Sequence, residues 1–278
     1  MSLVWHGDGA YPEPAPIGAG GWARAGLRGA ALVVLLLGGL AVLLPVRLLE
    51  WPLTGARRPI SGQVPVWVSR AALVILGIRT RQHGRPMTRP GAVVANHVSW
   101  LDIFVLNARK RVWFVAKAEV ARWPFIGWLA HATGTVFIRR DPREARAQVA
   151  VIEKRLKLGQ KLLFFPEGTS SDGRRVLSFK STLFAAFLKQ ETGRGLYVQP
   201  LTLVYRAPEG ADSRFYGWWG DMALAPHMLQ VLAQRRQGAV DLIWHAPVEV
   251  SEHADRKTLA RTCQAAVERG LAEAGISP

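Results

Sequence analysis

The sequence predicts an α/β protein in which helices flank a central mixed sheet, preceded by apolar helices that embed in a membrane. One observation behind this prediction is alternation, because short apolar runs with strand character and longer helical stretches follow one another from about residue 91 to residue 274. The other is an uncharged segment over residues 29–46, which is close to the shortest helix that can cross a bilayer.

The amino-terminal part divides into a tail and a membrane region. Residues 1–25 are rich in glycine and proline and are expected to be a disordered tail. Residues 26–80 are expected to anchor the protein, through a helix over 29–46 that Pro45 ends or bends and a shorter interfacial helix over 64–78. A cleaved signal peptide is the alternative, but no clear small-x-small cleavage site precedes the next segment, which favours a retained anchor.

Residues 81–278 are expected to form one folded domain, without internal repeats. Strands are predicted at about 91–95, 112–115, 134–138, 161–165, 197–204 and 240–249. Helices are predicted at about 99–108, 142–158, 180–191, 221–235 and 254–274.

The first predicted strand leads into Asn96–Asp102, which reads Asn-His-Val-Ser-Trp-Leu-Asp. A histidine–carboxylate pair is what a hydroxyl nucleophile needs, because the imidazole takes the proton and the carboxylate fixes its tautomer. Five positions along one helix would separate His97 and Asp102 by roughly 140°. We therefore expect Ser99 to cap a helix whose first turn holds Asp102, with His97 in the preceding loop. The alternative is an aspartate that meets only the helix dipole and an unrelated loop histidine.

Composition limits the class of partner. The net charge of +16, from 36 Lys and Arg against 20 Asp and Glu, indicates an anionic partner. No nucleic acid is expected, because zinc-finger and RNA-recognition signatures are missing and the basic residues are spread along the chain. The apolar amino end favours an anionic membrane instead. The single cysteine, Cys263, excludes an internal disulfide and is expected to be structural, and the histidines show no metal-ligand pattern.

Further motifs follow in order along the chain. Gly134–Arg140 reads Gly-Thr-Val-Phe-Ile-Arg-Arg, Phe165–Thr169 reads Phe-Pro-Glu-Gly-Thr, and Val198–Leu201 is apolar with a proline. With Asn96–Asp102, these stretches resemble the four signature blocks of the glycerolipid acyltransferase family, of the lysophosphatidic acid acyltransferase type. The resemblance covers roughly residues 90–205 and implies that residues 81–278 are an acyltransferase domain with the glycerolipid acyltransferase fold.

The resemblance implies a role for each matching residue. His97 would be the general base on the free hydroxyl of a lysolipid acceptor, with Asp102 orienting its ring, and the oxygen would attack the thioester of acyl carrier protein or coenzyme A. This chemistry requires no cofactor and no metal. Pro166 cannot extend the strand before it, so the residues that follow should lie where α/β sheets bind ligands. The residues expected to bind substrate are Arg140 (rather than Arg139), Glu167, Gly168, Thr169 and Lys180.

One departure from the family pattern concerns the acceptor. The third block commonly continues with an arginine, whereas this chain has Ser170. This version of the block, followed by Ser-Asp-Gly and later by Trp218–Met222, resembles the bacterial lyso-ornithine lipid acyltransferase branch. The alternative for the tryptophan pair is an aromatic patch at the bilayer surface. In that branch the lipid head is a zwitterion without phosphate, so a phosphate-binding arginine is dispensable. The alternatives are a 1-acyl-sn-glycerol-3-phosphate acyltransferase that uses another basic residue (Arg174, Arg175 or Lys180) and a non-catalytic membrane lipid-binding protein.

The expected location is a bacterial inner membrane with the catalytic domain on its cytoplasmic face. Positive charges after the apolar helix, at Arg47, Arg57 and Arg58, slightly outnumber those before it, at Arg24 and Arg28. The acyl donors implied by the family are cytoplasmic, which agrees with this orientation.

Overall fold

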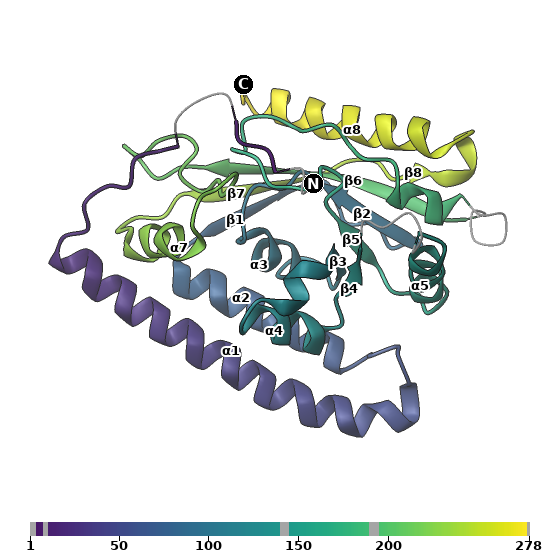
Figure 1. The fold of residues 1–278 in the computed structure, drawn as a ribbon, viewed down its shortest axis with the longest axis horizontal. Coiled ribbons are helices and arrows are strands. Elements are labelled where there is room, and N and C mark those ends of the chain that lie inside the picture. Colours follow the sequence, from purple (N-terminus) through teal and green to yellow (C-terminus); the bar gives the residue numbers. More distant parts are fainter. Residues whose placement is uncertain (1–3, 8–10, 140–144, 189–194, 277–278) are drawn as a thin grey trace.

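A computed structural model describes residues 4–7, 11–139, 145–188 and 195–276. Its described part contains an eight-stranded mixed sheet in the order β1-β7-β6-β2-β5-β3-β4, with β8 pairing with β6 (Figure 1). The strands are β1 (Arg79–His83), β2 (Gly91–Ala95), β3 (Trp113–Lys117), β4 (Val136–Ile138), β5 (Leu162–Phe164), β6 (Tyr197–Arg206), β7 (Ala239–Trp244) and β8 (Val248–Glu249).

The strands at the centre of the sheet run parallel, whereas antiparallel pairing occurs where β6 meets β7 and β8. β2 pairs in parallel with β5 on one side and with β6 on the other, and β3 and β4 continue the parallel run. β6 pairs antiparallel with β7 and β8, while β1 runs parallel to β7. The parallel strands therefore end at one common edge, where the chain after β2 and the chain after β5 meet.

Helices cover both faces of the sheet (Figure 1). Alternate residues of each strand point to opposite faces, so Val93 packs into one core and Val94 into the other. The first core also holds buried residues of α1 (Ala19–Thr54), α2 (Val64–Leu76), α3 (Asp102–Asn107) and α7 (Leu224–Ala233). The second holds those of α5 (Ala145–Lys157) and α8 (Arg256–Glu273). The short α4 (Ile126–Thr133) lies beside α1.

The predicted fold class is confirmed, and all six predicted strands are present. The predicted strand 240–249 is divided into β7 and β8. Strand β1 was not predicted; it lies at the edge of the sheet and consists of polar, mostly exposed residues. An edge strand with neither face buried lacks the apolar alternation by which strands are recognised. Helix α4 was not predicted either.

The predicted helix 180–191 is wrong over its described part, which forms a 3₁₀ turn at Leu183–Phe187. Phe184 and Phe187 are fully buried and contact Phe164 with ring centroids 5.4 and 6.0 Å away. Side chains three positions apart eclipse one another in a 3₁₀ helix, so the tighter winding brings both rings onto one face. Residues 189–191 lie outside the described residues.

The apolar amino-terminal helix is longer than expected. α1 begins at Ala19, inside the expected tail, and continues through Pro45 and Pro52 to Thr54, so of the two expectations for Pro45 the end of the helix is wrong. A proline removes only one intrahelical hydrogen bond. Contacts hold both ends of α1: Arg24 Nε donates to Ala233 O at 3.0 Å, and Ile60 N donates to Glu50 Oε1 at 2.6 Å.

The described tail residues also make contacts instead of lying free. The ring of Trp5 lies 6.1 Å from Trp219, and that of Tyr11 lies 5.7 Å from it. Asp221 N donates to the hydroxyl of Tyr11 at 3.0 Å. The high glycine and proline content of the tail predicts disorder, but its aromatic residues, together with Ala15 and Ile17, contact the domain.

We predict that Gly91→Ala strongly destabilises the protein. Gly91 has φ 136°, and an added Cβ would lie 1.8 Å from Tyr197 O, so the β2–β6 pairing would have to open. We expect a loss of more than about 3 kcal/mol in the free energy of unfolding, measured by thermal or urea unfolding in detergent. The control is Gly159→Ala, because Gly159 also has positive φ (73°) but an added Cβ would meet nothing within 4 Å. Equal losses in the two variants would show that the contact with Tyr197 is unimportant.

Candidate active site

The turn after β2 is held by a side chain that continues the sheet. Asn96 is fully buried, its Nδ2 donates to Leu203 O at 3.0 Å, and its Oδ1 accepts from Leu203 N at 2.8 Å. These two bonds imitate a strand pairing with β6 one residue beyond the end of β2. They fix where the backbone leaves the sheet, and therefore where His97 begins.

His97 and Asp102 form the predicted pair. His97 Nδ1 lies 2.7 Å from Asp102 Oδ2, and the aspartate is fully buried while 24% of the histidine side chain is exposed. Because the carboxylate accepts from Nδ1–H, the lone pair of the imidazole lies on Nε2. Nε2 is therefore the basic nitrogen of a partly exposed ring, and Asp102 fixes the orientation of that ring through Nδ1.

The expected N-cap at Ser99 is wrong. Instead of the Ser99 hydroxyl bonding to the backbone of Asp102, the carboxylate of Asp102 bonds to the backbone of Ser99. Helix α3 begins at Asp102 with Leu101 as its N-cap, and among the described residues the Ser99 hydroxyl accepts only from Leu101 N, at 3.4 Å. Instead, Asp102 Oδ2 reaches back and accepts from Val98 N at 2.9 Å and from Ser99 N at 3.2 Å. This is the carboxylate half of a capping box without the hydroxyl half. The same oxygen therefore fixes the turn and orients the imidazole.

The other oxygen of Asp102 has a donor that sequence analysis missed. The hydroxyl of Tyr205, on β6, donates to Asp102 Oδ1 at 2.6 Å. Tyr205 is 103 positions away in the chain, and no local pattern connects the two residues. Burial raises the pKa of Tyr205 well above its usual value, and the adjacent Asp102 raises it further, so the phenol keeps its proton.

Glu167 lies beside the pair but faces the backbone. Its side chain is 1% exposed, Oε2 accepts from His97 N at 3.3 Å, and Oε1 accepts from Leu177 N at 3.2 Å. Burial raises the pKa of Glu167 well above its usual value, and the charges of Asp102 and Asp172 raise it further. Glu167 thus connects the loop after β5 to the histidine.

The loop after β5 follows the turn after β2 closely. Ser171 N donates to His97 O at 2.9 Å, and Lys180 N donates to Pro166 O at 2.9 Å. Gly168 has φ 74°, the left-handed conformation that such a sharp turn requires. Thr169 is half-buried beside it. Arg140 lies outside the described residues.

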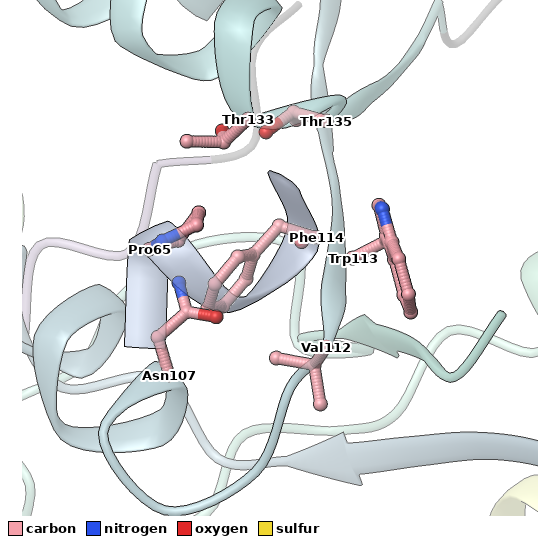
Figure 2. A pocket seen from close by; sticks show the side chains of 8 residues that line it. Pro65, Asn107, Val112, Trp113, Phe114, Thr133 and Thr135 are labelled. Carbon is pink, nitrogen blue, oxygen red and sulfur yellow. The ribbon is translucent and has the colours of Figure 1, made fainter. Parts of the chain in front are cut away.

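Aromatic rings support the histidine from the side of β5. The imidazole of His97 stacks on Phe165 with centroids 4.1 Å apart and planes 13° apart, and Phe114 lies 6.3 Å from Phe165. Behind Phe114 lies a small pocket, where its ring points towards Pro65 and Asn107 while Trp113 points to the opposite side of β3 (Figure 2). The pocket has room for about one water molecule.

Ser170 occupies the position of the arginine that the family pattern would place here. Its side chain is 8% exposed, and its hydroxyl donates to Trp218 O. Trp218 N donates in turn to Val98 O at 2.9 Å, so the loops that carry residues 98, 170 and 218 are joined. Within the described residues, no group of three or more His, Cys, Asp or Glu side chains could hold a metal ion.

Comparison with known proteins agrees with this geometry. The model of the family described as Acyltransferase matches residues 78–204. The chain is 53% identical to the lyso-ornithine lipid O-acyltransferase of Rhodobacter capsulatus, over 97% of this chain and 98% of that protein. It is 37% identical to the protein of the same name from Rhizobium meliloti, over 91% and 87% of the two chains.

A solved structure supports the fold. The 1-acyl-sn-glycerophosphate acyltransferase of Thermotoga maritima aligns with a TM-score of 0.58 at 22% identity, over 89% of this chain and 98% of that one. The matched range of the family model includes the segment in which the structure brings His97 and Asp102 together. The chain is an acyltransferase enzyme that belongs to the glycerolipid acyltransferase family.

Proposed function

We propose that this protein transfers a fatty acyl group from a thioester to the free hydroxyl of a lysolipid, and that the acceptor is lyso-ornithine lipid. The observation that carries the reaction type is the contact of His97 Nδ1 with Asp102 Oδ2 at 2.7 Å. A base oriented by a buried carboxylate suits the deprotonation of an alcohol. The names of the near-full-length relatives support the acceptor.

In the proposed mechanism, Nε2 of His97 takes the proton of the lysolipid hydroxyl as its oxygen attacks the thioester carbonyl. The new C–O bond gives a tetrahedral oxyanion, which collapses with cleavage of the C–S bond. The thiolate leaves and recovers the proton from the imidazolium, which Asp102 stabilises meanwhile. Proton transfer contributes about 10²–10⁴ in rate, so positioning and oxyanion stabilisation supply the remainder.

The side chain of Ser170 supports an acceptor without phosphate. A buried serine that donates to Trp218 O leaves no space for an arginine unless the adjoining loop moves. Another basic residue is engaged nearby, because Asp172 Oδ2 lies 3.5 Å from Arg175 Nε. Mixed charges of this kind suit a zwitterionic amino-acid head better than a dianionic phosphate.

We further propose that α1 embeds in the cytoplasmic leaflet of a bacterial inner membrane. It is the described helix whose length and composition would allow it to cross a membrane, and only 11% of its most apolar window is buried. Because α1 packs against α7 and α4 of the domain, and Arg24 bonds to Ala233, a position along the membrane surface fits better than a perpendicular span. Large apolar side chains are exposed on it at Leu27, Val34, Leu48, Leu49 and Leu53.

The positive charge of the chain supports two further partners. A net charge of +16 favours an anionic bilayer, where each basic residue near the surface adds roughly 1 kcal/mol. It also suits the acidic acyl carrier protein, or the phosphates of coenzyme A, as the carrier of the acyl group. Arg140 and Lys180 remain proposed substrate-binding residues, together with Gly168 and Thr169.

We assign Glu167 a positioning role and predict a pH effect on stability. In the unfolded chain its carboxyl loses a proton near pH 4.5, whereas burial keeps the proton bound to higher pH in the folded protein. The folded state therefore binds more protons above about pH 4.5, and the free energy of unfolding falls as the pH rises. Thermal unfolding in detergent at pH 5 and pH 8 should show a larger loss for the wild type than for Glu167→Gln. Parallel losses in the two proteins would contradict the burial effect.

We predict that His97→Ala lowers acyl transfer by at least about 10³-fold while membrane association survives. Release of the carrier thiol by purified protein, with and without lysolipid, measures the reaction. The matched control is His83→Ala, because His83 is an exposed histidine on the edge strand β1. Normal activity in His97→Ala would rule out the assignment, and no acceptor-dependent thiol release in the wild type would favour a lipid-binding protein without turnover.

We predict that lyso-ornithine lipid wins a direct competition. Lyso-ornithine lipid and lysophosphatidic acid are offered together with one labelled acyl-carrier-protein donor, and the products are separated. We expect most of the label in ornithine lipid for the wild type. Label mainly in phosphatidic acid would overturn the proposed acceptor and would indicate that another basic residue replaces the missing arginine.

A further inference from the structure

The carboxylate of Asp102 is held from both of its oxygens. Oδ2 accepts from the imidazole of His97 and from two backbone amides of the same turn. Oδ1 accepts from the hydroxyl of Tyr205 at 2.6 Å, and this tyrosine comes from the opposite side of the site, on β6. The phenol therefore joins the side chain of Asp102 directly to β6.

We propose that Tyr205 is a positioning residue for acyl transfer, which holds Asp102 so that Oδ2 faces the imidazole of His97. This inference rests on the proposed function, because it assigns a role within the same reaction. Tyr205 does not touch the reacting atoms. It acts through Asp102, and its removal should change how readily the imidazole takes a proton.

The register of the sheet places Tyr205 for this role. Leu203 is bonded at both its N–H and its C=O to the side chain of Asn96. Leu203 and Tyr205 lie two positions apart on β6, so their side chains point to the same face, and both belong to the core that covers α3. The bonds that start the catalytic turn therefore also set the distance from Tyr205 to Asp102.

The chemistry of the phenol suits a permanent donor. The side chain is 7% exposed, and burial together with the charge of Asp102 raises the pKa of Tyr205 well above its usual value. The hydroxyl thus keeps its proton throughout the working pH range and donates it to Oδ1. A buried carboxylate needs such donors, because an ionised group removed from water is otherwise strongly destabilised.

Removal of the Tyr205 hydroxyl should shift the pH–rate profile in one predictable direction. In Tyr205→Phe, Oδ1 loses its described donor, so the negative charge on Asp102 is less stabilised and attracts protons more strongly. The imidazole of His97 then takes up a proton at higher pH than in the wild type. Because only the neutral imidazole acts as a base, the acidic limb of the pH–rate profile moves to higher pH.

The test compares Tyr205→Phe with Tyr216→Phe. Tyr216 is 1% exposed, its ring lies 5.5 Å from that of Tyr205, and its hydroxyl bonds to Gln237 and Gly238. Both variants lose one buried hydroxyl, so both should be less stable. Only Tyr205→Phe is expected to shift the acidic limb of kcat/KM and to lower kcat about tenfold or more with little change in KM. Equal profiles in the two variants would overturn the proposal.

A second measurement does not depend on the acceptor or on turnover. The ¹⁵N NMR titration of the His97 imidazole in detergent, assigned by its loss in His97→Gln, should have a higher midpoint in Tyr205→Phe. Replacement of Tyr205 by a fluorinated tyrosine, a stronger donor of the same shape, should lower that midpoint, which covers the case in which Tyr205→Phe does not fold. An unchanged midpoint would overturn the proposal, whereas a wild type that fails to acylate lyso-ornithine lipid would contradict the proposed acceptor alone.

Discussion

The buried carboxylate of Asp102 is the constraint on which the rest of the site depends. A carboxylate with no access to water is stable only if donors surround it, and here the donors come from the imidazole, two backbone amides and a phenol. These groups belong to the turn after β2 and to β6, so one side chain requires two distant segments to be correctly placed. The histidine is oriented because the carboxylate that contacts it is itself held by these other donors.

The unequal lengths of two neighbouring strands make room for that carboxylate. β2 ends at Ala95, where it pairs with Leu201, but β6 continues to Arg206. Over this extension β6 pairs with β7 on one side, and the turn of residues 96–102 takes the side that β2 has left. β6 therefore supplies the backbone groups that bind the catalytic turn, because it extends beyond the end of β2.

The sequence could predict those parts of the fold and site that are encoded locally. The buried strands, the position of His97 next to Asp102 and the loop at Glu167 all follow from short runs of residues. Non-local features escaped prediction: β1 has a polar sequence because it lies at an edge, and Tyr205 acts across 103 positions of the chain. Ser99 and Asp102 matched a capping-box pattern, in which the hydroxyl and the carboxylate each accept from a backbone amide of the other residue. In the structure the carboxylate of Asp102 accepts from Ser99 N, and the same oxygen contacts His97.

Two buried carboxyls lie in one site, and their surroundings divide the work between them. Asp102 has donors on both oxygens, including a phenol that keeps its proton, which suits a permanent charge beside an imidazole. Glu167 has two backbone donors and two negative neighbours, so burial and like charge raise its pKa. Glu167 therefore keeps its proton to higher pH than an exposed carboxyl does. The same two acids could not exchange roles without exchanging these surroundings.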